Sequence, residues 1–153
     1  MAKIIRCIDH YGKEHDSPIE KFMFRASAYG ALKKDDKVLF VQERWTKLWE
    51  LPGGGVKPHE KLEEALLREF EEETGIIVEF KKLVTFQEDF FYAEDRDEAW
   101  HSLRLIYRVR ERGGALKQTG NQDDITASQF FSRDQLNVYN TKPAVYSILD
   151  TIY

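Results

Sequence analysis

The sequence predicts a single domain of the α/β class, and three observations carry this prediction. Several short segments have the apolar or alternating pattern of β-strands, and one longer segment has the composition of an α-helix. The chain has 153 residues, which is the usual size of one domain. It contains no repeat of fixed period, no low-complexity tract and no linker, so we expect one domain over residues 1–153.

The expected strands are runs of apolar, aromatic or alternating residues bounded by turn residues. They cover residues 3–9, 22–32, 38–41, 76–84 and 100–110, and a last strand ends at Phe130-Phe131. A turn at Tyr11-Gly12-Lys13 follows the first strand and completes an amino-terminal piece, residues 1–20. The polar turn Lys33 to Asp36 joins the next two strands into a hairpin.

A glycine-rich loop and the best-defined helix follow one another. Leu51 to Pro58 is expected to be an irregular loop, because three glycines and two prolines remove ladder donors and backbone restraint. His59 to Thr74 is built from Leu, Glu, Ala, Lys and Arg and predicts an α-helix that Gly75 caps. Residues 141–153 form an expected carboxy-terminal helix, because apolar residues recur there at helical spacing.

Composition and charge exclude several classes of protein. Hydrophobic residues make up 42% and charged residues 33%, which excludes a disordered or fibrous chain, and no window has the roughly 18 apolar residues of a membrane helix. The 23 Lys and Arg against 27 Asp and Glu lack the basic excess that a nucleic-acid partner requires. Cys7 is the only cysteine, so disulfides and cysteine zinc sites are excluded and a cytoplasmic location is expected.

Some glutamates of the expected helix lie on its apolar side. On a helical wheel the apolar arc is formed by Leu62, Ala65, Leu66 and Phe70. Glu69 and Glu73 fall within about 20° of the middle of that arc, and Glu72 lies at its edge beside Arg68. An ordinary amphipathic helix places its carboxylates on the opposite side, so these glutamates call for an explanation.

Converging carboxylates repel one another, and the burial of one unpaired charge is costly. A cation must therefore balance them, either a basic side chain such as Arg68 or a divalent ion, of which Mg²⁺ or Mn²⁺ suits oxygen ligands. The alternative is a solvated, salt-bridged helix surface, which is what most charge runs are. The glycine-rich loop favours a phosphate group nearby, because free amides and a helix amino terminus attract anions.

Charged residues and glycines follow a fixed spacing over Gly54 to Ile76. Gly54 is followed after five residues by Glu60, and after seven more by Arg68-Glu69-Phe70, Glu72-Glu73 and Gly75-Ile76. This spacing resembles the Nudix box, the signature of hydrolases that cleave a nucleoside diphosphate linked to another moiety. Every fixed charged or glycine position of the pattern is filled. Phe70 stands where the family more often has an aliphatic residue, a difference expected to affect packing more than chemistry.

The resemblance extends over residues 20 to 136 and implies an α/β/α sandwich with a mixed β-sheet. Outside the box it rests on Arg25-Ala26-Ser27-Ala28, Val38-Leu39-Phe40-Val41 and Trp49-Glu50-Leu51-Pro52-Gly53-Gly54. It implies that Glu69, Glu72 and Glu73 hold the divalent ions, often with the Gly53 carbonyl. It also implies that Arg68 orients a glutamate through a charged hydrogen bond.

The chemistry of phosphoanhydride hydrolysis gives these residues catalytic roles. The reaction needs a water activated near neutral pH and charge neutralisation on the nonbridging oxygens, which clustered Mg²⁺ ions supply. One carboxylate accepts the proton of the water, with Glu69 or Glu72 as the candidates. In the family this base can instead lie on a later loop, a position that Asp123 and Asp124 resemble; a solvated turn is the alternative there.

Candidate substrate contacts lie outside the box. Arg25 and Arg44 are candidates for phosphate contacts, against the alternative of surface salt bridges. Tyr92 lies 16 residues after Ile76, where a tyrosine resembles a marker of the dinucleoside polyphosphate branch. Phe91 stands where members that cleave ADP-ribose have a proline, which disfavours that substrate, and hydrolysis of damaged nucleoside triphosphates stays open.

The sequence therefore predicts a Mg²⁺-dependent pyrophosphohydrolase with a small nucleotide as its partner, and no membrane partner. The alternative is a nucleotide-sensing or partner-binding domain of the same fold without turnover. The complete set of box glutamates favours the enzyme. The sequence leaves the oligomeric state open, a homodimer included.

Overall fold

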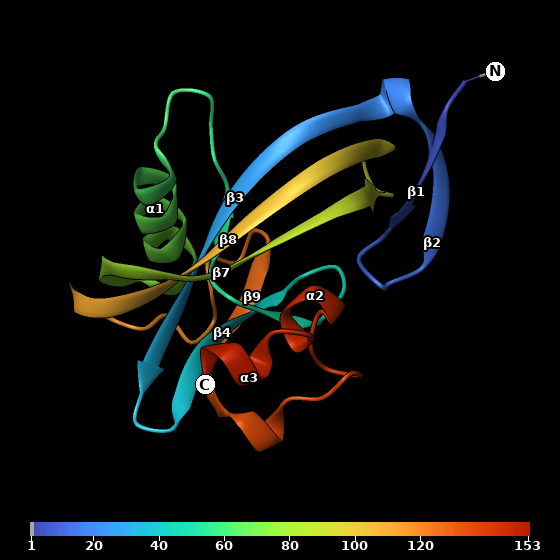
Figure 1. Ribbon diagram of the computed structural model, residues 1–153. Coiled ribbons are helices and arrows are strands. Elements are labelled where there is room, and N and C mark those ends of the chain that lie inside the picture. The colour runs from blue at the N-terminus through green and yellow to red at the C-terminus, as the bar shows by residue number, and fades with distance from the viewer. Residues whose placement is uncertain (1) are drawn as a thin grey trace.

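The computed structural model describes residues 2–153 as a curved, mixed β-sheet with helices on both faces (Figure 1). The strands are β1 (Ile4–Ile8), β2 (Glu14–Pro18), β3 (Phe22–Lys34), β4 (Lys37–Glu43), β5 (Trp49–Glu50), β6 (Gly53–Gly55), β7 (Ile76–Ala93), β8 (Glu98–Gly114) and β9 (Ile125–Ser132). The α-helices are α1 (Leu62–Thr74), α2 (Pro143–Tyr146) and α3 (Leu149–Ile152). None of the helices in residues 2–153 is long and apolar enough to span a bilayer.

The sheet combines parallel and antiparallel pairs. Its strand order is β2-β1-β7-β8-β3-β4-β5, with β6 added to β3 and β9 added to β4. The long strands β7 and β8 are antiparallel, whereas β3 and β8 run parallel in register from Phe22↔Ala99 to Leu32↔Val109. The expected α/β class and mixed sheet are confirmed.

Two apolar cores lie on opposite faces of the sheet, because side chains alternate along each strand. In β4, Leu39 packs with Leu66 and Phe70 of α1 on one face. Val38 and Phe40, its neighbours, belong to the other core, which includes Val145, Leu149 and Ile152 of the carboxy-terminal segment. In Figure 1, α1 lies on one side of the sheet and α2 and α3 lie on the other, which is the sandwich that the resemblance implied.

The glycine-rich segment differs from the expected irregular loop. Gly53–Gly55 forms the short strand β6, which pairs antiparallel with β3 through Tyr29↔Gly53 and Ser27↔Gly55. Gly53 has a φ of 145°, and a Cβ on it would come within 2.2 Å of the Ala28 carbonyl oxygen. The glycines therefore allow two backbones to approach, and so permit a strand where the composition indicated none.

Other element boundaries also differ from expectation. Helix α1 begins at Leu62, not His59, because the Lys61 amide at its start bonds the Glu64 carboxylate at 2.8 Å. It ends as predicted, with Gly75 at a φ of 75°. The strand expected over residues 76–84 continues to Ala93, crossing three irregularities in register. The expected final helix is divided into α2 and α3, because Ile148 leaves the helical region with φ −116° and ψ 7°.

The amino-terminal hairpin contains a strand that the sequence analysis did not predict. β2 pairs with β1 from Ile4↔Pro18 to Ile8↔Glu14, and its polar sequence gives no apolar alternation. Cys7 lies opposite His15 in this pair, is 2% exposed, and donates from Sγ to the His15 carbonyl oxygen at 3.4 Å. One parallel bridge, Ile8↔Phe91, attaches the hairpin to β7.

Candidate active site

The inward glutamates of α1 face the glycine strand β6. Glu73 is 5% exposed, and its Oε2 accepts a hydrogen bond from the Gly53 amide at 3.0 Å. Glu69 lies against Gly54, where an added Cβ would come 2.9 Å from the Glu69 carboxyl carbon. Burial raises the pKa of Glu73 well above its usual value, against the effect of the Gly53 hydrogen bond, and the charge of Glu69 adds to the increase.

Arg68 connects three carboxylates at the outer side of this pair. It donates to Glu60 at 2.5 and 2.9 Å, to Glu69 at 2.7 Å and to Glu72 at 3.3 Å. The hydrogen bond from Arg68 lowers the pKa of Glu60 to about 2. The guanidinium therefore holds Glu69 in a fixed orientation at the edge of the site.

Glu72 takes a more peripheral place than Glu69 and Glu73. Its side chain is 55% exposed, and Arg68 is its ion-pair partner. The cavity described below is lined by Gly53, Glu69 and Glu73, whereas Glu72 is absent from its lining among residues 2–153. This agrees with its position at the edge of the apolar arc on the helical wheel.

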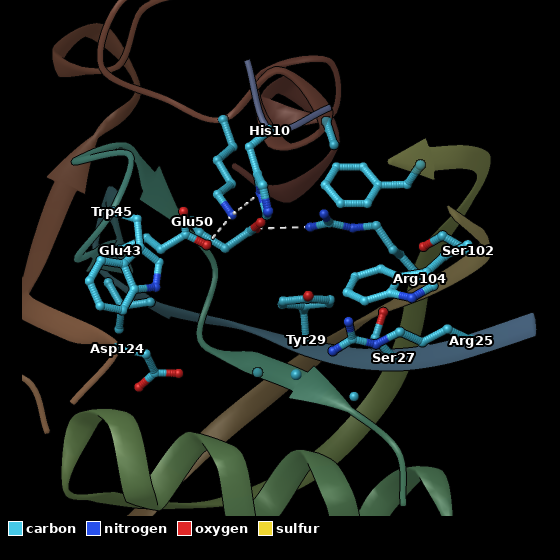
Figure 2. Close-up of a pocket in the computed structure, with 18 of the residues that line it drawn as sticks. His10, Arg25, Ser27, Tyr29, Glu43, Trp45, Glu50, Ser102, Arg104 and Asp124 are labelled. Carbon is cyan, nitrogen blue, oxygen red and sulfur yellow. Dashed lines mark hydrogen bonds and ion pairs between the residues drawn. The ribbon is translucent and has the colours of Figure 1, made fainter. Parts of the chain in front are cut away.

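A cavity of about 290 Å³ lies between the two glutamates, the inner face of the sheet and the carboxy-terminal segment. Figure 2 shows Arg25, Ser102 and Arg104 on one side of it, and Glu43, Trp45 and Asp124 on the other. The strands supply these side chains at alternate positions, so that the face of β3 and β8 is polar where it lines the cavity.

Arg104 and Glu50 form a buried ion pair that the sequence analysis did not predict. The Arg104 Nη2 donates to Glu50 Oε1 at 2.9 Å, and its guanidinium lies 4.4 Å from the centroid of the Tyr29 ring. Burial alone lowers the pKa of Arg104, but the Glu50 carboxylate outweighs it and the net shift is upward. The available signal was the alternation within β8, which puts Ser102 and Arg104 on one face of the strand beside Trp100.

Arg25, predicted as a phosphate contact, lines the cavity and stacks on an aromatic ring. Its guanidinium lies 4.1 Å from the centroid of the Trp100 ring, and a Cβ on Gly55 would come within 2.8 Å of its Nη2. The Phe91 ring, on the neighbouring strand β7, stacks on the Trp100 ring with the two ring centroids 5.7 Å apart. No hydrogen bond or ion pair engages Arg25 among the described residues, so its donors are available to an anionic ligand.

Of the other three candidate substrate contacts, one lines the cavity and two do not. Asp124 lines the cavity and accepts a hydrogen bond from Asn121 at 2.7 Å. Arg44 donates to the carbonyl oxygen of Asp123 at 2.5 Å and to that of Gln122, so it holds the loop that carries Asp124. The Tyr92 hydroxyl donates to Asp97 at 2.5 Å, and the residues lining the cavity in 2–153 include neither Arg44 nor Tyr92.

A second polar cluster, on the Glu43 side of the cavity, brings together three segments that are distant in sequence. It is formed by Lys142, His10 and Glu43. Lys142 donates to Glu43 Oε1 at 2.5 Å and lies 3.4 Å from His10 Nδ1. Figure 2 shows His10 and Glu43 near one another. Burial lowers the pKa of His10, and the Lys142 charge acts in the same direction. Sequence spacing gave no signal for this cluster, because its members lie on the first hairpin, β4 and the start of α2.

The oxygen ligands at one end of the cavity fit a hard divalent cation. Glu73 is buried beside a second carboxylate, and within residues 2–153 it has no lysine or arginine at ion-pair distance. Burial of such a carboxylate favours either a bound proton or a metal ion. Carboxylate and carbonyl oxygens are the ligands that Mg²⁺ and Mn²⁺ prefer.

Comparison with known proteins finds one matching family model and relatives with two different enzyme names. The family model described as "NUDIX domain" matches residues 23–152. The ADP-ribose pyrophosphatase of Methanocaldococcus jannaschii is 33% identical over 110 residues, which are 70% of this chain and 61% of that protein. The 8-oxo-dGDP phosphatase NUDT18 of Mus musculus is 33% identical over 95 residues, 60% of this chain and 27% of that protein. The matched part is thus less than two thirds of the length of either relative.

Solved structures have the same arrangement of sheet and helices. A MutT Nudix hydrolase from Burkholderia pseudomallei superposes with a TM-score of 0.71 at 24% identity, covering 86% of this chain and 99% of the other. An ADP-ribose pyrophosphatase from Streptococcus suis superposes with a TM-score of 0.64 at 25% identity, covering 84% and 89%. These superpositions agree with the fold described above.

Proposed function

The chain belongs to the Nudix hydrolase family, and from this premise we propose a Mg²⁺-dependent pyrophosphohydrolase that cleaves a phosphoanhydride bond in a nucleoside diphosphate derivative or a nucleoside triphosphate. One observation carries the proposal. A single cavity contains two inward glutamates, Glu69 and Glu73, and an arginine, Arg25, that has no hydrogen-bond or ion-pair partner within residues 2–153. A metal-held phosphate chain needs both kinds of group within reach.

The metal ligands of the proposal are the carboxylates of Glu69 and Glu73 and the carbonyl of Gly53, with Glu72 contributing from the edge of the helix. When bound, Mg²⁺ or Mn²⁺ neutralises charge on the nonbridging phosphate oxygens and lowers the pKa of a coordinated water. Arg68 positions Glu69 and Glu72 through its hydrogen bonds, so we assign it a positioning role.

Proton transfer from the attacking water is assigned to Glu69, with Asp124 as the alternative. Both side chains line the cavity, whereas Glu72 is largely exposed outside it. A general base must lie within hydrogen-bond reach of the proton that it accepts, which favours residues that face the substrate. Kinetics of Glu69→Gln and Asp124→Asn as a function of pH separate the two, because the variant that lacks the base loses the acidic limb of the rate profile.

The substrate in this proposal is a nucleotide whose phosphates lie between the glutamates and Arg25. Trp100, Tyr29 and Trp45 supply aromatic surface in the same cavity for a base or a sugar. The relatives are named for ADP-ribose and for 8-oxo-dGDP, which share a diphosphate attached to a purine nucleoside. A purine nucleoside diphosphate derivative is therefore the substrate class we propose.

A substrate panel with Mg²⁺ and product identification by mass tests the proposal. The panel includes ADP-ribose, dinucleoside polyphosphates, and ordinary and 8-oxo nucleoside di- and triphosphates. We expect cleavage of at least one diphosphate linkage, dependent on the metal and much slower in Glu69→Gln. Saturable nucleotide binding without any product would contradict the enzyme and favour a sensing domain.

The location and partners follow from the sequence in this proposal. The net charge of −4 and the single cysteine support a cytoplasmic protein with a small-molecule partner. Fluorescence microscopy of the tagged chain and gel filtration at several concentrations test the location and the oligomeric state.

A further inference from the structure

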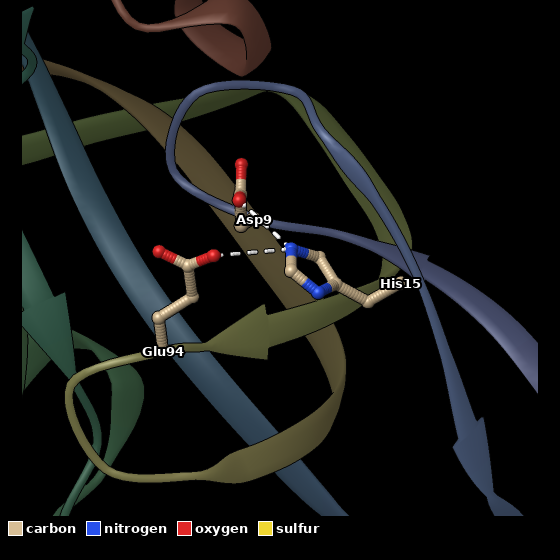
Figure 3. Close-up of side chains that lie close together, drawn as sticks. All are labelled: Asp9, His15 and Glu94. Atoms are coloured by element: carbon tan, nitrogen blue, oxygen red, sulfur yellow. Dashed lines mark hydrogen bonds and ion pairs between the residues drawn. The ribbon is translucent and has the colours of Figure 1, made fainter.

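Asp9, His15 and Glu94 come together (Figure 3), and Asp9 is the member of the cluster that lines the cavity. Asp9 and His15 lie on the amino-terminal hairpin, and Glu94 follows the end of β7. The hydrolytic chemistry proposed above uses none of the three. The cluster therefore needs an explanation of its own.

The spacing of the three side chains matches ligand atoms around one ion. His15 Nε2 lies 2.9 Å from Asp9 Oδ2 and 3.3 Å from Glu94 Oε1, and all three atoms lie within 4.8 Å of one another. Zinc bonds of roughly 2.0–2.1 Å in tetrahedral geometry place neighbouring ligand atoms about 3.3 Å apart. Figure 3 shows the imidazole nitrogen between the two carboxylates.

The buried Asp9 carboxylate faces the other two side chains through its Oδ2 atom. Its side chain is 2% exposed, and Oδ1 accepts hydrogen bonds from the amides of Tyr11 at 2.8 Å and Lys13 at 2.9 Å. Oδ2 lies within hydrogen-bond distance of His15 Nε2, at 2.9 Å, and no lysine or arginine of residues 2–153 pairs with Asp9. The imidazole is the only group there that can supply a positive charge to this buried carboxylate, and a divalent ion can take the place of the Nε2 proton between them.

The imidazole is also fixed before any ion binds. The Tyr92 ring packs on His15 with centroids 4.6 Å apart and planes inclined by 30°. The Tyr92 hydroxyl is held in turn by Asp97. Metal-ligating imidazoles and carboxylates are oriented by outer contacts of this kind, and their loss weakens binding.

We propose that Asp9, His15 and Glu94 form a binding site for a divalent transition metal, for which Zn²⁺ is the best match, with water completing the coordination. One imidazole nitrogen and two carboxylate oxygens suit Zn²⁺ better than Mg²⁺, which prefers oxygen ligands alone. The site differs in residues and in metal preference from the glutamates of α1. It joins the first hairpin to the β7–β8 turn, and so fixes two segments that line the cavity through His10 and Arg96.

Calorimetric titration of the chelator-treated full chain with Zn²⁺, in saturating Mg²⁺, tests the site without relying on activity. We expect one equivalent of Zn²⁺ to bind to the wild type, and His15→Gln and Glu94→Gln each to weaken it at least about tenfold. Glu94 is 46% exposed, so its substitution leaves the fold intact, and circular dichroism verifies this for both variants. Co²⁺ in place of Zn²⁺ should give a visible absorption band in the wild type that His15→Gln loses.

Two controls distinguish this site from other zinc ligands. His101 pairs with Glu88 at 2.6 Å but has no third ligand beside it within residues 2–153, so His101→Gln should leave the Zn²⁺ affinity unchanged. Glu69→Gln should also retain it, because that variant alters only the glutamates of α1. Unchanged Zn²⁺ affinity in His15→Gln and Glu94→Gln, loss of the zinc in Glu69→Gln, or no Zn²⁺ binding by the wild type would each overturn the proposal.

Discussion

Glu73 combines deep burial with the absence, among residues 2–153, of a basic partner at ion-pair distance. Within that part of the chain its carboxylate accepts one hydrogen bond, from the Gly53 amide, and burial raises its pKa well above the usual value. In the metal-free protein, a raised carboxyl pKa means that the charged form destabilises the folded state as the pH rises. The ionised Glu73 side chain therefore lowers the free energy of unfolding, and a bound cation or proton restores it.

Replacement of Glu73 by glutamine should separate stability from turnover. We expect Glu73→Gln to be at least as stable as the wild type without metal, because the charge that burial penalises is gone. Its turnover should fall by at least about a hundredfold, because one ligand charge is lost. Thermal unfolding and steady-state kinetics measure the two effects, with the outward Glu71→Gln as control. Near-normal turnover at saturating Mg²⁺ would contradict the assignment.

Glu60 should make the stability depend on pH in acid. Its pKa in the folded protein is about 2, against an ordinary value of 4.5, because Arg68 donates a hydrogen bond to it. A lowered carboxyl pKa gives stability that is complete above about pH 4.5 and is lost as the pH falls toward 2. Urea unfolding at a series of pH values should show a steeper loss over this range for the wild type than for Glu60→Gln. Parallel curves for the two proteins would refute the coupling.

At the scale of elements, β6 determines how closely the helix approaches the sheet. Its glycines lie between the β3 backbone and the Glu69 side chain, and each limits a different contact. At Gly53 an added Cβ meets backbone, whereas at Gly54 it meets the end of a flexible side chain. Substitutions at adjacent positions of one strand should therefore have different effects.

Gly54→Ala should impair the chemistry and Gly53→Ala the fold. The Gly54 methyl group displaces the Glu69 carboxylate, so we expect turnover to fall with little change in melting temperature. The methyl group added at position 53 meets the Ala28 carbonyl oxygen, and the backbone there has a positive φ. We therefore expect the free energy of unfolding to fall by more than about 3 kcal/mol, or the variant not to fold. Melting temperature and turnover of both variants check this. Equal loss of stability in the two would contradict it.

The elements differ in how well the sequence predicted them, and for physical reasons. The inward position of Glu69 and Glu73 was predictable, because helical periodicity is a local property. Gly53–Gly55 was not predicted as a strand, because its pairing with β3 depends on a close approach that composition does not encode. The polar strand β2 was missed because its pairing with β1, and not its own pattern, defines it.

At the scale of the whole molecule, the candidate site combines parts that are distant in sequence. Glu50 and Arg104 lie 54 residues apart, and Lys142 and Glu43 lie 99 apart. Linear spacing carries no information on such pairs, so the sequence predicted the glutamate end of the cavity and not its sheet floor. Arg25 was predicted because it lies within a segment that resembles the family.

Mg²⁺ should stabilise the folded chain through the glutamates of α1. An ion present at about ten times its Kd adds about 1.4 kcal/mol to the free energy of unfolding. For a chain of this size that corresponds to a rise of about 3 to 6 °C in melting temperature. We expect Glu69→Gln to show a smaller rise and Glu71→Gln the full one, in thermal scans with and without Mg²⁺. An equal rise in Glu69→Gln would mean that the ion binds elsewhere.

The burial of Cys7 makes the chain's only thiol a reporter of local opening. Its sulfur lies between β1 and β2, and burial raises the pKa of the thiol, so a maleimide or disulfide reagent reaches it only when the hairpin separates. Labelling of the native protein should therefore be much slower than labelling in urea. Its rate reports the opening equilibrium of this hairpin without an engineered probe. Addition of Zn²⁺ should slow the reaction further, because an ion held by Asp9, His15 and Glu94 keeps the two strands closed.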